Sequence, residues 1–230
     1  ADKIAAFITE PLAGSTGVLI PPKGYLERIR EICTEHDILL IFDEVITGFG
    51  RLGTPFAADY FGVEPDMITC AKGLTSGTVP MGAVMVKQEI YSAFQDRDPK
   101  AIDLFHGYTY SAHPMAAAAL IATLDVYRED GLFEHANERS SYWENALHSL
   151  KGTDPIIDIR NLGLVAGIEM EPRDGRSGAR GYDVFTDAFH NHNLLVRMTG
   201  DILAFSPPLI AEKEHIDQIV ETLRKIIPNH

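Results

Sequence analysis

The sequence predicts an α/β fold: a mainly parallel sheet with helices, followed by a smaller α+β domain at the C-terminal side. Short continuous apolar runs alternate with a helical pattern in the first half, as in 38–42, and this is typical of parallel sheets. From about residue 112 onward, long helices precede a series of strands, which indicates a different architecture. The chain has 230 residues, 45% of them hydrophobic, so it can bury a substantial core.

In the first half, the predicted strands are 4–9, 38–42, 67–70 and 82–87. The segment 21–37 predicts a helix, with prolines near its start and Leu26, Ile29 and Cys33 at helical spacing. A helical turn is expected after residue 87. Strands and helices that alternate in this way predict a parallel sheet covered on both faces.

In the second half, a long helix is predicted from His113 to about Arg128 and another at 131–151. The further expected elements are strands near 156–160, 163–170, 194–197 and 202–205, and helices at 181–192 and 211–226. We place a domain boundary near residue 118, so that 1–118 belong to the larger sheet domain and 119–230 form the small C-terminal domain. The long helix would bridge the two.

Composition narrows the functional class. The formal charge is -13, which argues against nucleic acid as a partner. No apolar stretch reaches the ~18 residues of a membrane span, and no basic leader precedes an apolar region, so we expect a cytoplasmic protein. Cys33 and Cys70 lack the spacing of a zinc site or a disulfide framework and are expected to be reduced. The chain begins at Ala1, close to an apolar strand, which suggests a piece of a longer protein.

Two charged residues follow predicted strands: Asp43 comes after 38–42, and Lys72 comes two residues after 67–70. In open α/β sheets ligands bind outside the carboxyl ends of the strands. If these strands are neighbours, the two side chains could face one crevice. A lysine in a partly apolar site becomes a nucleophile toward carbonyls, and a carboxylate can hold a protonated ring nitrogen. Pyridoxal 5'-phosphate (PLP) requires this pair.

Two other interpretations compete with this one. A lysine after a strand is ordinarily a solvated loop residue. An apolar strand that ends in Asp43 and Glu44 is also similar to the magnesium-binding strand of ATPases, but no GxxxxGK[ST] phosphate loop occurs in this chain. Six residues separate His106 from His113 and no third ligand lies nearby, so no metal site is predicted.

The run PLAGSTGVLIPPKGYLERIREICTEHDILLIFDEVITGFGRLGTPFAADYFGVEPDMITCAKGL resembles the signature region of class III PLP-dependent aminotransferases. The DEVxTGFGR run and the later AKG lysine are specific, and the similarity extends to the C-terminus. HGYTYSAHP, IIDIRNLGL and LLVRMTGDILAFSPP resemble the ω-amino acid–pyruvate group, which includes β-alanine–pyruvate aminotransferases. The resemblance implies part of a fold type I large domain plus the small C-terminal domain.

The resemblance also implies roles for individual residues. Lys72 would bind PLP as a Schiff base and then move a proton. Asp43 would pair with the pyridinium nitrogen, and Val45 would pack against a ring face. Thr109, with the backbone of Tyr108, would reach the cofactor phosphate in the neighbouring subunit of a homodimer.

Arg197 would bind the substrate carboxylate through its planar fork. Relatives that act on ornithine or 4-aminobutyrate carry a glutamate that gates this arginine, and Ser15 stands at that position here. A mobile Arg197 is therefore expected. Ile46 stands where those relatives often have a glutamine that reaches the ring hydroxyl.

The family also has a substantial N-terminal half, with a Gly/Ser-rich phosphate loop and a ring-stacking aromatic, and this chain lacks it. The predicted function of the parent protein is transfer of an amino group from an ω-amino acid or amine to pyruvate. Two alternatives stay open. One is another PLP reaction, such as decarboxylation or racemisation, and the other is an inactive fragment without the N-terminal half.

Overall fold

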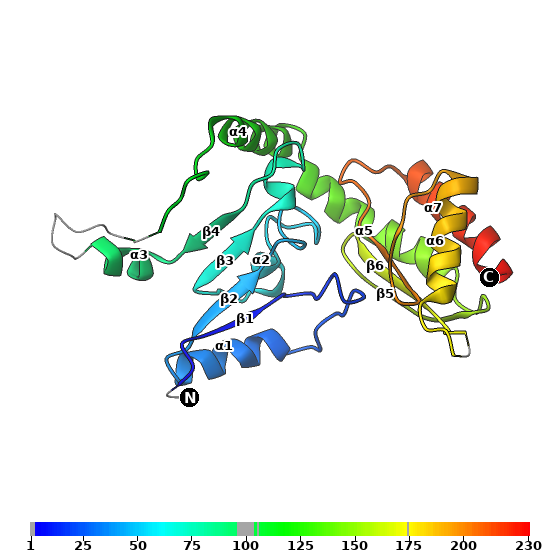
Figure 1. The fold of residues 1–230 in the computed structure, drawn as a ribbon, viewed down its shortest axis with the longest axis horizontal. Helices are drawn as coiled ribbons and strands as arrows, with labels where there is room; N and C mark the ends of the chain where they lie inside the picture. Colours follow the sequence, from blue (N-terminus) through cyan, green and yellow to red (C-terminus); the bar gives the residue numbers. More distant parts are fainter. Residues whose placement is uncertain (1–2, 96–103, 105, 174) are drawn as a thin grey trace.

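The computed structural model describes residues 3–95, 104, 106–173 and 175–230. Within them, the strands form two four-stranded sheets that lie side by side (Figure 1). The first contains β1 (Ala6–Thr9), β2 (Leu39–Asp43), β3 (Met67–Cys70) and β4 (Ala83–Val86). The second contains β5 (Ile156–Leu162), β6 (Val165–Met170), β7 (Arg197–Thr199) and β8 (Ile202–Phe205). The expected α/β class with a second, α+β part is confirmed.

The α-helices are α1 (Tyr25–Glu35), α2 (Ala57–Phe61), α3 (Gln88–Gln95), α4 (Pro114–Glu129), α5 (Leu132–His148), α6 (Ala179–His192) and α7 (Lys213–Ile226), and the 3₁₀ helices are η1 (Lys72–Thr75) and η2 (Ile227–Asn229). Figure 1 shows α1 beside the first sheet and α6 and α7 beside the second. In the described part of the chain, no helix has the length and apolar character needed to cross a membrane. The expected domain boundary near residue 118 falls inside α4 and stays a prediction.

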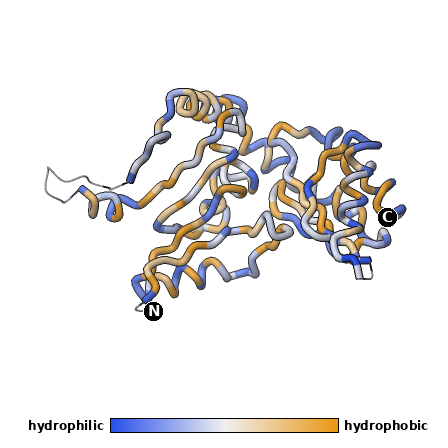
Figure 2. The backbone as a smooth tube through the Cα atoms, viewed as in Figure 1, coloured by the Kyte–Doolittle hydropathy of each residue, from blue (hydrophilic) through white to orange (hydrophobic). Residues whose placement is uncertain are grey.

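The first sheet has the order β1-β2-β3-β4, with β1, β2 and β3 parallel and β4 antiparallel to β3. Asp43 stands opposite Thr69 in the register, so β2 and β3 are neighbours that end at the same edge. This confirms the condition on which the shared crevice for Asp43 and Lys72 depends. Figure 2 shows mainly hydrophobic colour along these strands.

One expectation about this sheet was wrong: its two faces are not both covered. Leu40 and Phe42 are fully buried in a cluster with Leu26 and Cys33 of α1. Side chains alternate along a strand, so Ile41 and Asp43 point to the opposite face, with Ile8 and Val84 at its edges. Ile8 is 58% exposed and Val84 63% exposed, so that apolar face is open within the described chain.

The second sheet has the order β5-β6-β8-β7 and is antiparallel throughout. Most of its buried residues share one cluster with residues of the first half, in which Trp143, Ile168 and Leu203 are fully buried. Phe49 and Leu74 belong to the same cluster. The two sheets are therefore joined by a common hydrophobic core.

The structure corrects some element boundaries. Helix α1 starts at Tyr25 rather than at 21, because consecutive prolines at 21–22 disfavour helical backbone and Gly24 adopts a left-handed φ of 83°. Strand β7 starts at Arg197 rather than 194, because its pairing with β8 begins at Arg197, opposite Ala204. Helix α2 was not expected.

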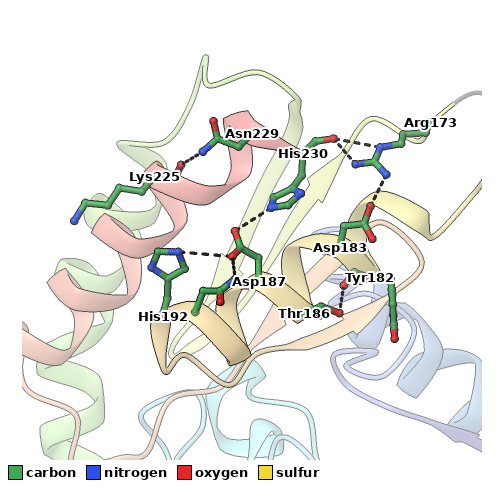
Figure 3. Close-up of polar contacts among 10 residues, drawn as sticks. Arg173, Tyr182, Asp183, Thr186, Asp187, His192, Lys225, Asn229 and His230 are labelled. Atoms are coloured by element: carbon green, nitrogen blue, oxygen red, sulfur yellow. Dashed lines mark hydrogen bonds and ion pairs between the residues drawn. The ribbon is translucent and has the colours of Figure 1, made fainter.

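The C-terminal residues are attached to α6 by polar contacts (Figure 3). The His230 ring contacts the Asp187 carboxylate at 2.9 Å, and Arg173 donates to the His230 carbonyl and to Asp183. His192 lies 3.8 Å from Asp187 and is half-buried.

Asp66 connects three elements of the first half. Its carboxylate accepts from Arg30 of α1 at 2.7 Å and from the Leu40 amide of β2 at 2.7 Å, and it lies 3.3 Å from the Lys87 ammonium. Burial alone would raise the pKa of Asp66, but these donors outweigh it and hold the pKa below its usual range.

We predict that Asp66→Asn lowers the free energy of unfolding by about 1–3 kcal/mol at pH 7, because a charged hydrogen-bond acceptor is lost. The folded-state pKa of Asp66 is depressed, so its stabilisation is present above the unfolded value of about 3.9 and is lost as pH falls through the folded value. Urea unfolding across this range should show the difference between wild type and variant shrinking on acidification.

Glu64→Gln is the matched control, because that carboxylate contacts the same Lys87 but its side chain is 82% exposed. It should change stability little. A difference for Asp66→Asn that did not depend on pH would contradict the role of the ionised carboxylate.

Candidate functional site

A cavity of about 880 Å³ lies at the carboxyl ends of β2 and β3, between the two sheets. Residues of both halves line it. The first half contributes Gly14, Val18, Val45, Ile46, Gly48, Phe49, Arg51, Lys72, Gly73, Ser76, Gly77 and Thr78. The remaining lining residues are Ala119, Ala122, Thr123, Val126, Tyr127, Leu132, Val165, Arg197, Ala204, Phe205, Ser206, Pro208, Leu209 and Ile210. Three of the expected site residues, Val45, Lys72 and Arg197, therefore share one cavity.

Lys72 is held in a backbone conformation that few lysines adopt. It starts η1 directly after β3 and has a left-handed φ of 48°. The next residue must be glycine, because a Cβ on Gly73 would lie 2.7 Å from the Phe49 Cβ. Tyr127 of α4 donates its hydroxyl to the Gly73 carbonyl at 2.7 Å. Backbone strain that is maintained by the packing of neighbouring residues is common at functional sites. The Lys72 side chain is exposed and lines the cavity.

Asp43 lies one strand away from Lys72, on the open face of the first sheet. Its side chain is half-buried. One carboxylate oxygen accepts from the Val45 amide at 3.0 Å, and this bond orients the side chain. The other oxygen has no hydrogen-bond partner within the described residues, so it is free to accept a proton donor from outside.

The fully buried carboxylate at this strand end is Glu44, and it has a structural role. Its two oxygens accept from the amides of Ala57 and Ala58 at 2.7 and 2.8 Å, and Thr47 donates to it at 2.7 Å. Burial raises the pKa of Glu44 although these bonds oppose the rise. Glu44 thus satisfies the hydrogen-bonding capacity of the first two amides of α2. We call the segment that connects β2 to α2 the connecting loop (residues 44–56), and Glu44 links its two ends.

Arg197 approaches the cavity from the second sheet. It opens β7 opposite Ala204 of β8, and it makes no ion pair with the described residues. Two residues further along β7, Thr199 donates to the Ser15 carbonyl at 3.0 Å. The segment with Ser15, where related enzymes were expected to carry the gating glutamate, therefore lies beside the Arg197 strand. The expected mobility of Arg197 stays a prediction.

Tyr108 and Thr109 are not brought to the cavity. They lie in the exposed stretch before α4, where Tyr108 is 51% exposed and has a left-handed φ of 47°. The Tyr108 amide donates to the His106 ring at 3.1 Å. Their expected role concerned a neighbouring subunit, and it stays a prediction.

Sequence reasoning missed Arg51 and Tyr127, which both line the cavity. Arg51 belongs to the connecting loop, and its Nη1 donates to the carbonyls of Ser206, at 3.3 Å, and Pro207. Burial lowers the pKa of Arg51, but a guanidinium stays protonated in proteins. Its position within a Gly- and Phe-rich motif was the available signal. Nothing in the sequence around Tyr127 distinguished it from a core residue of α4.

The cavity lining is positively charged, although the chain as a whole carries a formal charge of -13. Among the described residues that line it, the charged side chains are Arg51, Lys72 and Arg197, and none is acidic. The remaining lining is largely apolar or small. Such a site favours a compact anionic ligand with an apolar body.

The fold and cavity together define an α/β protein with a cavity at the strand ends that Lys72 lines. The chain belongs to the class III aminotransferase family, whose model matches residues 1–227. It is 62% identical over 227 residues to an omega-aminotransferase of Caulobacter vibrioides, covering 99% of this chain and 52% of that protein. It is 48% identical over 225 residues to a beta-alanine–pyruvate aminotransferase of Pseudomonas aeruginosa, covering 97% of this chain and 50% of that protein.

Solved structures agree in fold. A thermostable omega transaminase mutant from Pseudomonas jessenii superposes with a TM-score of 0.92 at 34% identity, covering 99% of this chain and 52% of that one. An (S)-enantioselective omega-transaminase from Thermomicrobium roseum gives a TM-score of 0.90 at 35% identity, again covering 99% and 52%. The chain therefore spans about half the length of the relatives that it matches.

We predict that Glu44→Gln lowers the free energy of unfolding by about 1–3 kcal/mol, because a glutamine must place its NH₂ against an amide donor in either orientation. Both Glu44 oxygens accept from backbone N–H groups, at Ala57 and at Ala58, so no rotamer avoids the conflict. Urea unfolding at neutral pH measures the loss.

The control is Glu27→Gln, on the exposed side of α1, which should change stability by less than about 0.5 kcal/mol. Equal effects from the two substitutions would show that Glu44 does not support α2.

Proposed function

We propose that this chain forms part of a PLP-dependent aminotransferase that moves an amino group from an ω-amino acid or amine to pyruvate. The observation that carries the proposal is the arrangement of Lys72, in a strained turn, with Asp43 at the end of the adjacent strand. The identity to the omega-aminotransferase and the beta-alanine–pyruvate aminotransferase supports the choice of substrate class.

The residues present fit PLP on three counts. Lys72 presents an amine to the cavity, Val45 and Ile46 form an apolar wall, and Asp43 has a carboxylate oxygen without a partner in the described chain. When bound, PLP supplies an aldehyde that takes up amino groups and a ring that withdraws electrons. We infer that the rest of the enclosure comes from protein outside this chain, because the face carrying Asp43 is open.

The roles of the chain's own residues follow from their chemistry. Lys72 would hold the cofactor covalently and, once released, would take a proton from the carbon that bears the amino group. Asp43 would keep a proton on the ring nitrogen, and its bond from the Val45 amide fixes the carboxylate for that task. Val45 would pack against the ring and exclude water from one face.

Arg197 would bind the acceptor carboxylate, since its guanidinium lines the cavity and makes no ion pair in the described chain. With Ser15 in place of a gating acid, the side chain is expected to swing aside for an uncharged donor group. We also propose that the protein is a homodimer in which Thr109, with the Tyr108 backbone, reaches the cofactor phosphate of the neighbouring subunit.

The first test concerns Lys72, in the protein as its complete gene encodes it. Wild type with PLP should show a visible absorption band, and borohydride reduction followed by peptide mass spectrometry should place the cofactor on Lys72. Lys72→Ala should lose both signals, while Lys151→Ala, at an exposed turn, should keep them. Cofactor fixed to another lysine in the Lys72→Ala variant would refute the assignment.

The same preparation tests the reaction class. Wild type should convert pyruvate to alanine only when an amine donor is present. Loss of CO₂ or inversion of the donor without alanine would indicate another PLP reaction. If the 230-residue chain alone gives no absorption band and the complete protein does, the chain by itself is an inactive part.

The second test concerns Arg197. A charge-assisted hydrogen bond contributes about 1.5–3 kcal/mol, so Arg197→Ala should lower kcat/KM for pyruvate by about tenfold or more. A carboxylate-free arylalkyl amine should lose little. Rapid-mixing measurements of each half-reaction separate the two effects.

Arg128→Ala is the control, because that arginine is 73% exposed on α4 and outside the cavity lining. Equal losses with pyruvate and with the amine would mean that Arg197 supports the structure and does not recognise the carboxylate.

A further inference from the structure

The Arg51 side chain crosses from the first half of the chain to a proline-rich segment of the second. That segment, which we call the wall segment (residues 206–210), follows β8 and forms one side of the cavity. Arg51 Nη1 donates to the carbonyls of Ser206 and Pro207, the first two residues of the wall segment. No other charged side chain of the cavity lining makes a hydrogen bond within the described chain.

The wall segment needs such an anchor because of its sequence. Pro207 and Pro208 carry no N–H, so only their carbonyls can form backbone hydrogen bonds. The Pro208 carbonyl accepts from the Ala211 amide at 2.9 Å, which is a turn within the same stretch. The Ser206 and Pro207 carbonyls accept hydrogen bonds from Arg51, whose backbone lies in the connecting loop. Arg51 therefore ties the wall segment to the connecting loop.

The backbone of Arg51 is itself held in place by neighbouring residues. Its carbonyl accepts from the Leu164 amide at 2.9 Å. A Cβ on Gly163 would lie 2.6 Å from that carbonyl oxygen, and a Cβ on Gly50 would lie 2.5 Å from the Phe133 ring. The backbone around Arg51 is thus packed at van der Waals distance on both sides. Because this backbone is fixed, the Arg51 side chain can hold the wall segment at a defined position.

Comparison with Arg160 shows what is unusual about Arg51. Arg160 also joins the two halves, by donating to the carbonyls of Gly17 and Val18, but Asp158 and Glu169 neutralise its charge at 2.6 and 2.7 Å. Arg51 has no carboxylate within 4 Å among the described residues, and it faces the cavity. If Arg51 served only to hold the two halves together, neutralising its charge would lower the desolvation cost of that contact.

We propose that Arg51 is a positioning residue for substrate binding. By holding the Ser206 and Pro207 carbonyls, it sets where the wall segment stands opposite Lys72, and so it controls how tightly the cavity holds a substrate. The inference rests on the proposed function. It differs from the role proposed for Arg197, because it concerns the apolar wall and hence every substrate, whether or not it carries a carboxylate.

The test compares Arg51→Met, Arg51→Lys and the exposed control Arg128→Met in the protein as its complete gene encodes it. Arg51→Met should raise KM by about tenfold or more for both a carboxylate-bearing donor and an arylalkyl amine, while kcat falls less than about threefold. Arg51→Lys should recover part of the affinity, because an ammonium can still donate to carbonyls. The absorption of bound cofactor should match wild type in all three.

A second readout does not depend on activity. Hydrogen exchange, followed by mass spectrometry of the peptide that covers 203–212, should speed up in Arg51→Met and stay unchanged in Arg128→Met. Unchanged exchange there would overturn the proposal. A kcat loss without a KM change would make Arg51 merely structural, and a KM rise confined to carboxylate substrates would make it a direct ligand. If wild type itself does not transaminate, the proposed function fails, and the exchange result still decides whether Arg51 holds the wall.

Discussion

The site depends on one buried carboxylate. Glu44 directly follows β2 and accepts hydrogen bonds from the first two amides of α2, so it links the two ends of the connecting loop. Several contacts around the cavity start from the connecting loop. Phe49 packs on Gly73 beside Lys72, Arg51 holds the wall segment, and Leu52 joins a cluster with Val165 of the second sheet. Burial of Glu44 is costly, and the three hydrogen bonds offset that cost.

Two arginines join the halves of the molecule, because each donates hydrogen bonds to backbone carbonyls of the other half. Arg51 extends from the first half to Ser206 and Pro207, and Arg160 extends from the second half to Gly17 and Val18. Both carbonyl pairs belong to segments that contribute to the cavity lining. The two halves that line the cavity are therefore connected by polar contacts as well as by the shared core.

One apolar face of the first sheet is open in the described chain, although both faces were expected to be covered. Parallel sheets are ordinarily buried on both sides, but here Asp43 shares its face with exposed Ile8 and Val84. Relatives are about twice as long as this chain. Asp43 is consequently half-buried, and one of its carboxylate oxygens has no hydrogen-bond partner in the described chain.

The sequence by itself determined the fold class, most elements and the lysine turn. Short continuous apolar runs and amphipathic helices are local patterns, and the Lys72-Gly73 pair and the DEVxTGFGR run are contiguous. Its errors arose where distant residues decide the outcome. Helix α2 is capped by Glu44, thirteen positions earlier, and β7 begins where pairing with β8 allows.

Tertiary structure alone decided which side chains meet. It placed Lys72 and Arg197 in one cavity, assigned burial to Glu44 rather than Asp43, and brought Arg51 to the wall segment 155 residues away. Hydrogen bonds and packing between segments so far apart leave no periodicity or spacing in the sequence. Chain topology and the shared core bring them together, and only the folded backbone specifies their distances.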